Sequence, residues 1–238
     1  MLVIDMGNKY LEGSINPKNI YDSVQYKIEF ARNNPDYFQP EGIMIFCGSQ
    51  GSGKTLSAVQ YVLKILKEYP KCILCTNVEI FTLPEHTRVV EYDGLDCLKN
   101  IENGQYGVIY FIDEIHLELN SLESKNIDMD TIVELSQQRK QRKHIVGTSQ
   151  VYMRMAKPLR EQVKHVVLCS NYFKLIQFNK YIDGFTSVEE NGKLKADVLG
   201  TYIWFHSPKL YDSYNTYAKM KRYKEEWKGR KQSYASWD

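Results

Sequence analysis

The chain has 238 residues, a formal net charge of only +2, 43% apolar residues and 25% charged residues. This length suffices for one α/β core and an additional part of roughly 60 to 70 residues. The ordinary composition and small net charge exclude a disordered chain and a polycation. No apolar run approaches the ~18 residues that would span a bilayer. The first residues lack the features of a secretory signal. We therefore expect a soluble, cytoplasmic protein.

Short apolar runs alternate with helical patterns over the first 170 residues. Apolar residues at helical spacing indicate helices, and short unbroken apolar runs suit buried strands of a parallel sheet. The expected order is helix 16–34, strand 42–47, helix 56–69, strand 72–78, short helix 95–103, strand 107–113, helix 129–143, strand 145–149 and strand 166–170. This alternation predicts an α/β fold with a mostly parallel sheet of five or more strands, covered by helices on both faces.

The pattern changes after Asn171. Residues 173–181 and 196–205 look like strands on either side of Asn191-Gly192, a strong hairpin signal. Residues 211–238 are rich in Tyr and Lys. We therefore divide the chain into a core domain over 1–170, in which 1–41 form a helical lead-in, and a small C-terminal β-hairpin and basic segment over 171–238.

Five cysteines are present, and most of them lie in or beside apolar, strand-like runs. Cys72 and Cys75 form a CxxC pattern, but inside a strand their side chains point to opposite faces. A second CxxC or a spaced His pair that would complete a zinc site is missing from the sequence. We expect all of them to be structural thiols: Cys47, Cys72, Cys75, Cys97 and Cys169.

The central motif is Gly48-Ser49-Gln50-Gly51-Ser52-Gly53-Lys54-Thr55, which matches G-x-x-x-x-G-K-[ST] at each defined position. Glycines let the backbone wrap around phosphates, and the following helix directs its positive end at the same anion. Lys54 would reach the β- and γ-phosphates, and the Thr55 hydroxyl would ligate Mg²⁺. Because the motif follows an apolar strand and opens a helix, it predicts an ATP-binding P-loop.

A second motif follows the apolar run at 108–112, where Asp113 and Glu114 come at the end of a strand. Open α/β sheets bind ligands at that edge. Asp113 would hold Mg²⁺ through its water shell, and Glu114 would be the general base for the attacking water. The pair favours hydrolysis over phosphoryl transfer to a bound acceptor, as in a small-molecule kinase, and over a non-catalytic nucleotide switch.

The run Thr148-Ser149-Gln150 ends another predicted strand. If this strand lies between the P-loop strand and the Asp113 strand, Ser149 or Gln150 would sense the γ-phosphate. Asn77, after the second strand, is a further candidate and would restrain Glu114. His116 and His144 lack the partners of a metal site or a triad, so we regard both as structural.

Basic residues form two clusters. One covers 139–144 and the other 219–231, and each suits either a phosphate backbone or a solvated helix face. The first cluster also offers a trans-acting arginine finger for a neighbouring subunit. We prefer Arg139 for this role, with Arg142 second and Arg154 or Arg160 as more distant choices.

These features together resemble the FtsK–HerA group of P-loop translocases, and within it the Zot-like proteins of phages. The matching segments are 48–55, 108–114, the helix ending at 139–144, the strand tip 148–150 and Tyr211-Asp212-Ser213-Tyr214. The arginine-rich helix before a strand also resembles the packaging ATPases of small tailed phages. By that likeness, Arg139 is the trans-acting arginine and Glu114 the catalytic glutamate.

The resemblance implies a ring of five or six subunits with DNA in its channel, and we expect this DNA to be double-stranded. Zot-like proteins usually continue into a membrane span, and none is evident before Asp238. We therefore expect a phage genome-packaging motor that docks on a capsid portal in the infected host's cytoplasm. The alternative is a Zot-like ATPase for filamentous phage assembly and extrusion that works with a membrane partner.

Overall fold

The computed structural model describes residues 17–117, 137, 140–190 and 193–215. The chain divides into two compact units after Tyr37. In the first unit, helix α1 (Pro17–Asn33) matches the predicted helix. It ends where the Asn34 backbone N–H donates to the Phe30 carbonyl at 2.9 Å, because Pro35 disfavours helical backbone in the residue before it.

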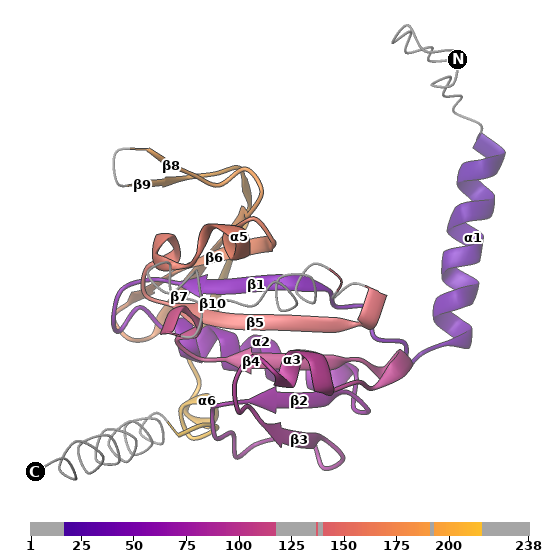
Figure 1. Cartoon of the computed structure of the whole chain (residues 1–238), viewed down its shortest axis with the longest axis horizontal. Helices are drawn as coiled ribbons and strands as arrows, with labels where there is room; N and C mark the ends of the chain where they lie inside the picture. The colour runs from indigo at the N-terminus through magenta and orange to yellow at the C-terminus, as the bar shows by residue number, and fades with distance from the viewer. Residues whose placement is uncertain (1–16, 118–136, 138–139, 191–192, 216–238) are drawn as a thin grey trace, which may run out of the picture. The chain divides into compact units, whose positions relative to one another are not determined.

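The second unit is built on one sheet of eight strands in the order β10-β7-β6-β1-β5-β4-β2-β3 (Figure 1). Six neighbouring strands pair in parallel, namely β6, β1, β5, β4, β2 and β3. Strands β7 and β10 extend the sheet beyond β6 and pair antiparallel. Their bounds are β1 Gly42–Cys47, β2 Ile73–Thr76, β3 Arg88–Glu91, β4 Val108–Ile112, β5 Lys143–Ser149, β6 Val163–Tyr172, β7 Ile176–Asp183 and β10 Val198–Phe205.

The connections contain the helices. These are α2 Lys54–Glu68, α3 Cys97–Asn100, α5 Lys157–Arg160 and α6 Pro208–Tyr211, with 3₁₀ turns η1 Gly104–Tyr106, η2 Ile115–Leu117 and η4 Tyr152–Arg154. Helix α2 is the longest of them in this unit, with 15 residues. Of the single turns, α3, α5, η2 and η4 place Leu98, Leu159, Ile115 and Tyr152 in the cluster on the other face of the sheet, whereas Leu210 of α6 packs with the cluster that contains α2.

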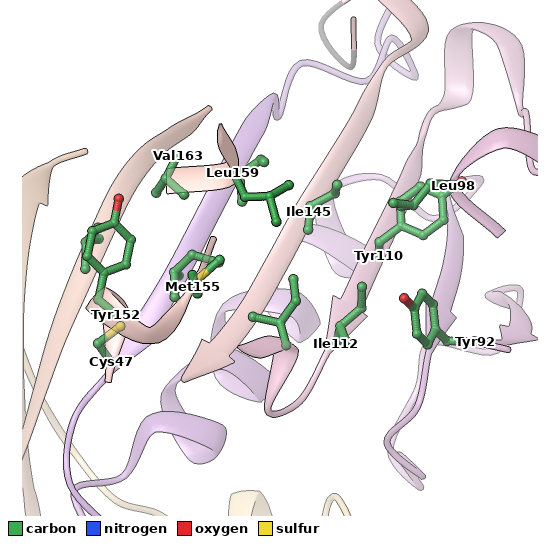
Figure 2. Packing of buried hydrophobic residues seen from close by; sticks show 14 of the residues in the cluster. Cys47, Tyr92, Leu98, Tyr110, Ile112, Ile145, Tyr152, Met155, Leu159 and Val163 are labelled. Atoms are coloured by element: carbon green, nitrogen blue, oxygen red, sulfur yellow. The ribbon is translucent and has the colours of Figure 1, made fainter. Parts of the chain in front are cut away.

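Both faces of the sheet are covered, which explains why strands β1 and β4 are almost entirely apolar. Met44 and Phe46 of β1 pack with Val59 and Val62 of α2 in one cluster. Alternate residues of the same strands face the opposite cluster, in which Tyr110 and Ile145 meet side chains from η4 and α5 (Figure 2). The α/β fold with helices on both faces of a mostly parallel sheet is therefore confirmed, and the sheet is larger than the minimum of five strands.

Strand β5 pairs with β1 on one side and with β4 on the other. This is the arrangement on which the proposed role of the Thr148-Ser149-Gln150 tip depends. The C-terminal ends of the P-loop strand, the Asp113 strand and the strand between them therefore share one edge.

The sequence prediction missed one strand of this sheet and misplaced the bounds of several others. Strand β3 was not predicted, because its four residues lie at the sheet edge and three of them are exposed, so no apolar run marks it. Strand β5 begins at Lys143 rather than Ile145. Residues 129–136, which start the predicted helix before it, lie outside the described residues.

The earlier start of β5 corrects the interpretation of the first basic cluster. The side chains of Lys143 and His144 are both buried. The Lys143 ammonium donates a 2.6 Å hydrogen bond to the Leu98 carbonyl at α3. A buried charge needs such a partner, so these two residues contact the protein interior and not a phosphate backbone.

The predicted strands after Asn171 are present as β7 and β10, and they pair with each other through most of their length. Between them, β8 (Val188–Glu190) and β9 (Lys193–Lys195) form a small hairpin across residues 191–192. The side chains of Cys72 and Cys75 lie in the core clusters on opposite faces of the sheet, as predicted for strand positions that are three residues apart.

His144 is held in the neutral state by its surroundings. Its Nδ1 lies 2.9 Å from the Gly42 carbonyl and its Nε2 lies 3.0 Å from the Tyr61 hydroxyl. Because a carbonyl only accepts, Nδ1 carries the proton and Nε2 accepts from Tyr61. Burial lowers the pKa of His144 from 6.5 to about 4.

This depressed pKa makes folding stability depend on pH. In the unfolded chain, His144 binds a second ring proton below about pH 6.5, whereas in the folded chain it does so only near pH 4. The stability that neutral His144 contributes to the fold is therefore present above pH 6.5 and is lost as the pH falls toward 4. We expect the wild type to lose about 2 kcal/mol between pH 7 and pH 5 from this residue. His144→Asn keeps a donor for Gly42 and should remove that part of the slope in urea unfolding. Equal losses in both proteins would contradict the assignment.

Candidate functional site

The loop between β1 and α2 is shaped by its glycines. Gly51 and Gly53 have φ values of +77° and +83°, in the left-handed region that favours glycine. A Cβ on Gly48 would lie 2.4 Å from the Ser52 hydroxyl and 2.8 Å from the Cys169 carbonyl. The loop is therefore tightly closed and leads directly into the N-terminus of α2, a site suited to anions.

The first two residues of α2 connect the loop to the end of β4. Lys54 is largely buried, and its Nζ lies 3.9 Å from Glu114 Oε1. The Thr55 hydroxyl donates to Asp113 Oδ1 at 2.9 Å. Residues separated by 58 positions in the chain thus meet at one edge of the sheet. The structure brings together the two segments that the sequence singled out.

Thr148 joins the two acidic residues, and the sequence analysis gave it no role of its own. Its hydroxyl donates to Asp113 Oδ1 at 2.6 Å and accepts from the Glu114 backbone N–H at 2.8 Å. The side chain is fully buried at the end of β5. Only a hydroxyl can donate and accept at once here, so Thr148 fixes the relative positions of Asp113 and Glu114.

Asn77 follows β2 and holds the peptide of Asp113. Its Nδ2 donates to the Asp113 carbonyl at 3.2 Å, and its Oδ1 accepts from the Asp113 N–H at 2.9 Å. The sequence analysis proposed that Asn77 restrains Glu114, whereas these bonds go to the backbone of the preceding residue. Asn77 thereby anchors the turn in which Glu114 adopts a φ of +53°.

The Glu114 carboxylate lies between two cationic or potentially cationic groups. One is Lys54, and the other is His116, whose Nδ1 lies 3.2 Å from Glu114 Oε2. A glutamate in the left-handed region is uncommon, and such strain is typical of functional sites. His116, which we regarded as structural, thus contacts the candidate base.

Ser149, one of the two candidate phosphate sensors, is buried. Its hydroxyl donates to the Val151 carbonyl at 3.1 Å. The Ser149 backbone carbonyl accepts from the Gly48 N–H at 3.4 Å. Gln150 is exposed just after β5, so the sensor role stays a prediction for it. Arg139 lies outside the described residues.

Arg142 precedes β5 and has a φ of +55°, and its carbonyl accepts from the Val108 N–H at 3.0 Å. It is therefore at the N-terminal ends of the strands. The seven residues of β5 separate it from the P-loop edge by about 20 Å. Arg160, in α5, donates to the Met153 sulfur at 3.0 Å.

Two thiols lie beside the loop but carry no charge. Cys47 ends β1 and Cys169 belongs to β6, and burial raises the pKa of both, that of Cys169 to about 12. Neither is a nucleophile at neutral pH. Across residues 17–117, 137, 140–190 and 193–215, no group of three or more His, Cys, Asp and Glu could by itself hold a metal ion.

Residues 42–221 of this chain match the sequence pattern of the protein family described as zonular occludens toxin (Zot). The matched residues include the loop, Asp113, Glu114 and β10. The chain belongs to the Zot family. Curated protein sequences give no match. In the part of this Zot-family chain that the structure describes, every helix is too short or too polar to cross a bilayer.

One solved structure has a similar fold, and two others align with TM-scores below 0.5. The N-terminal domain of zonular occludens toxin from Neisseria meningitidis is 17% identical, with a TM-score of 0.55 over 74% of this chain and 100% of that one. The genome packaging NTPase B204 from Sulfolobus turreted icosahedral virus 2, in complex with ATP-γS, is 13% identical, with a TM-score of 0.48 over 71% and 98%. The ATPase domain of G40P is 12% identical, with a TM-score of 0.49 over 85% and 99%. Membership of the Zot family, with the loop motif at 48–55, makes this chain a P-loop NTPase.

The hydroxyl of Thr148 gives a direct test of the site's geometry. Thr148→Val keeps the shape but removes both hydrogen bonds, so the Asp113 and Glu114 positions should loosen and nucleotide turnover should fall about 10-fold or more. Steady-state hydrolysis measures this. Thr148→Ser keeps the hydroxyl and should retain most of the turnover. Equal turnover in Thr148→Val and the wild type would show that the hydroxyl does not position the pair.

Proposed function

We propose that this chain hydrolyses ATP at the edge where β1, β5 and β4 end. The observation that supports this is the convergence of Lys54, Thr55, Asp113 and Glu114, joined by Thr148. Lys54 would bind the β- and γ-phosphates together with the loop amides. Asp113 would then hold a metal ion, and Glu114 would activate the attacking water.

The oxygen donors fit a Mg²⁺ ion. Thr55 Oγ1 and Asp113 Oδ1 are 2.9 Å apart, and Mg²⁺ prefers hydroxyl, carboxylate and water oxygens to nitrogen or sulfur. We infer that these two residues would hold it, directly or through water. Bound there, the ion would neutralise charge on the β- and γ-phosphates.

Glu114 would act as the general base. The water oxygen attacks the γ-phosphorus, the bond to the bridging oxygen of ADP breaks, and the water's proton passes to the Glu114 carboxylate. Lys54 Nζ lies 3.9 Å from Glu114 Oε1, and His116 Nδ1 lies 3.2 Å from Glu114 Oε2. With Lys54 directed at the phosphates, Oε1 would be available to water while His116 faces the other oxygen.

Two substitutions separate binding from chemistry. Lys54→Ala should weaken ATP binding and abolish turnover. Glu114→Gln keeps the size of the side chain, so it should bind ATP but hydrolyse it roughly 100- to 10,000-fold more slowly. Nucleotide titration and phosphate release measure the two steps. Normal turnover by Glu114→Gln would mean that another group activates the water.

We also propose that hydrolysis moves DNA during phage assembly and extrusion, with a membrane protein as partner. Membership of the Zot family supports this reading more than the genome-packaging motor that the sequence analysis placed first. A ring of about five or six subunits would carry out the transport. Arg142 lies about 20 Å from its own P-loop edge, so it would act only on the site of a neighbouring subunit. Arg139, which lies outside the described residues, stays our first candidate for the trans-acting arginine.

The transport reading predicts which additions raise ATP turnover. DNA should stimulate the isolated chain, less so at higher salt, because phosphate contacts release counterions. Membrane vesicles from cells that make the phage assembly proteins should raise turnover further, and vesicles from cells without them should not. Full stimulation by DNA alone would instead favour packaging, and indifference to DNA and vesicles alike would exclude transport as the function.

A further inference from the structure

Gln177 of β7 lies directly behind the loop, and its side chain is fully buried. Its Nε2 donates to the Ser52 carbonyl at 2.9 Å and to Asn179 Oδ1 at 3.1 Å. Its Oε1 lies 3.2 Å from His206 Nε2, which must carry the proton because an amide oxygen only accepts. Both amide hydrogens and the amide oxygen of Gln177 are therefore engaged.

The bond to Ser52 sets the direction of a whole peptide group. The Ser52 carbonyl and the Gly53 N–H belong to one planar trans unit, in which the C=O and the N–H point in opposite directions. Since Gln177 holds the carbonyl toward β7, the Gly53 N–H is directed away from β7. An amide directed away from the supporting strand suits a phosphate, which the amides of a P-loop bind.

The contact is close enough to be specific. A Cβ on Gly53 would lie 2.1 Å from Gln177 Oε1, so the backbone rests on this side chain without a gap. Asn179, two residues along β7, holds the next part of the chain: its Oδ1 accepts from the Ser57 hydroxyl at 3.1 Å. The Ser57 N–H in turn donates to the Gly53 carbonyl at 2.9 Å.

We propose that Gln177 is a positioning residue for nucleotide binding. It holds the Ser52–Gly53 peptide in the anion-binding orientation before ATP arrives, and Asn179 and His206 hold Gln177 itself. Gln177 would act through the loop backbone and not through contact with the substrate. The proposal rests on the proposed binding of ATP at this loop.

Gln177→Met tests it, since Met has similar length but no donor. We expect the Kd for ATP and the KM to rise about tenfold, the cost of one buried hydrogen bond, while kcat at saturating ATP stays within about twofold. Backbone amide exchange over residues 48–56, measured without nucleotide, should become faster. Ile182→Val, a core change on the same strand, is the control: it should lower the midpoint of urea unfolding and leave the Kd, the KM and the loop's exchange unchanged.

The outcomes separate this proposal from the proposed function. Wild-type binding of ATP that Lys54→Ala removes supports the function, whatever Gln177→Met does. If Gln177→Met then binds ATP as the wild type does, or if its loop exchanges at the wild-type rate, the positioning role is wrong. If Ile182→Val weakens binding as much, the effect is general destabilisation and the proposal fails. A wild type that does not bind ATP overturns both proposals.

Discussion

One carboxylate oxygen holds the nucleotide edge of this protein together. Asp113 Oδ1 accepts hydrogen bonds from the hydroxyls of Thr55 and Thr148, which belong to α2 and β5 respectively. Helix α2 covers one face of the sheet, and β5 lies within the sheet. The Asp113 carboxylate at the end of β4 therefore connects the helix to the sheet. In a largely buried setting, each of these bonds strengthens the others, and the loss of one leaves polar groups unsatisfied.

The adjacent acidic residues have different surroundings because the backbone turns sharply between them. Glu114 has a φ of +53°, a conformation that costs of order 1 kcal/mol or more for a residue other than glycine. The hydrogen bonds from Asn77 to the Asp113 peptide and from the Glu114 N–H to Thr148 offset this cost. As a result, one carboxylate faces the hydroxyls and the other faces Lys54 and His116.

Local patterns were sufficient to predict most of the sheet and the centre of the site. Uninterrupted apolar runs marked β1 and β4, since these strands are buried on both faces, whereas only Ile145 and Val146 marked β5. The loop motif and the Asp113-Glu114 pair were predicted to be neighbours because they end parallel strands. Edge strand β3 could not be found in this way, because one residue in four is protected from solvent and no period results.

Long-range polar contacts were beyond the reach of the sequence patterns. Thr148 looks like any hydroxyl at a strand end until its distance from Asp113 is known, and Gln177 lies in a segment without a motif. Lys143 was misread for a related reason, and so was the place of His144 in the basic cluster, although His144 was correctly expected to be structural. A charged run usually indicates a solvated surface, and only the fold shows that the Leu98 carbonyl and the Tyr61 hydroxyl satisfy these two side chains inside the protein.

The antiparallel strands at the sheet edge also affect how the chain folds as it is made. Ser52 and Gln177 are 125 positions apart, so the ribosome completes the loop long before it releases the strand that backs it. Contacts of such long range close late, because the loop-closure entropy must first be overcome. The phosphate-binding loop of a nascent chain therefore lacks its support until β7 has joined β6, and a partly synthesised protein would bind nucleotide poorly even though its whole loop motif is already present.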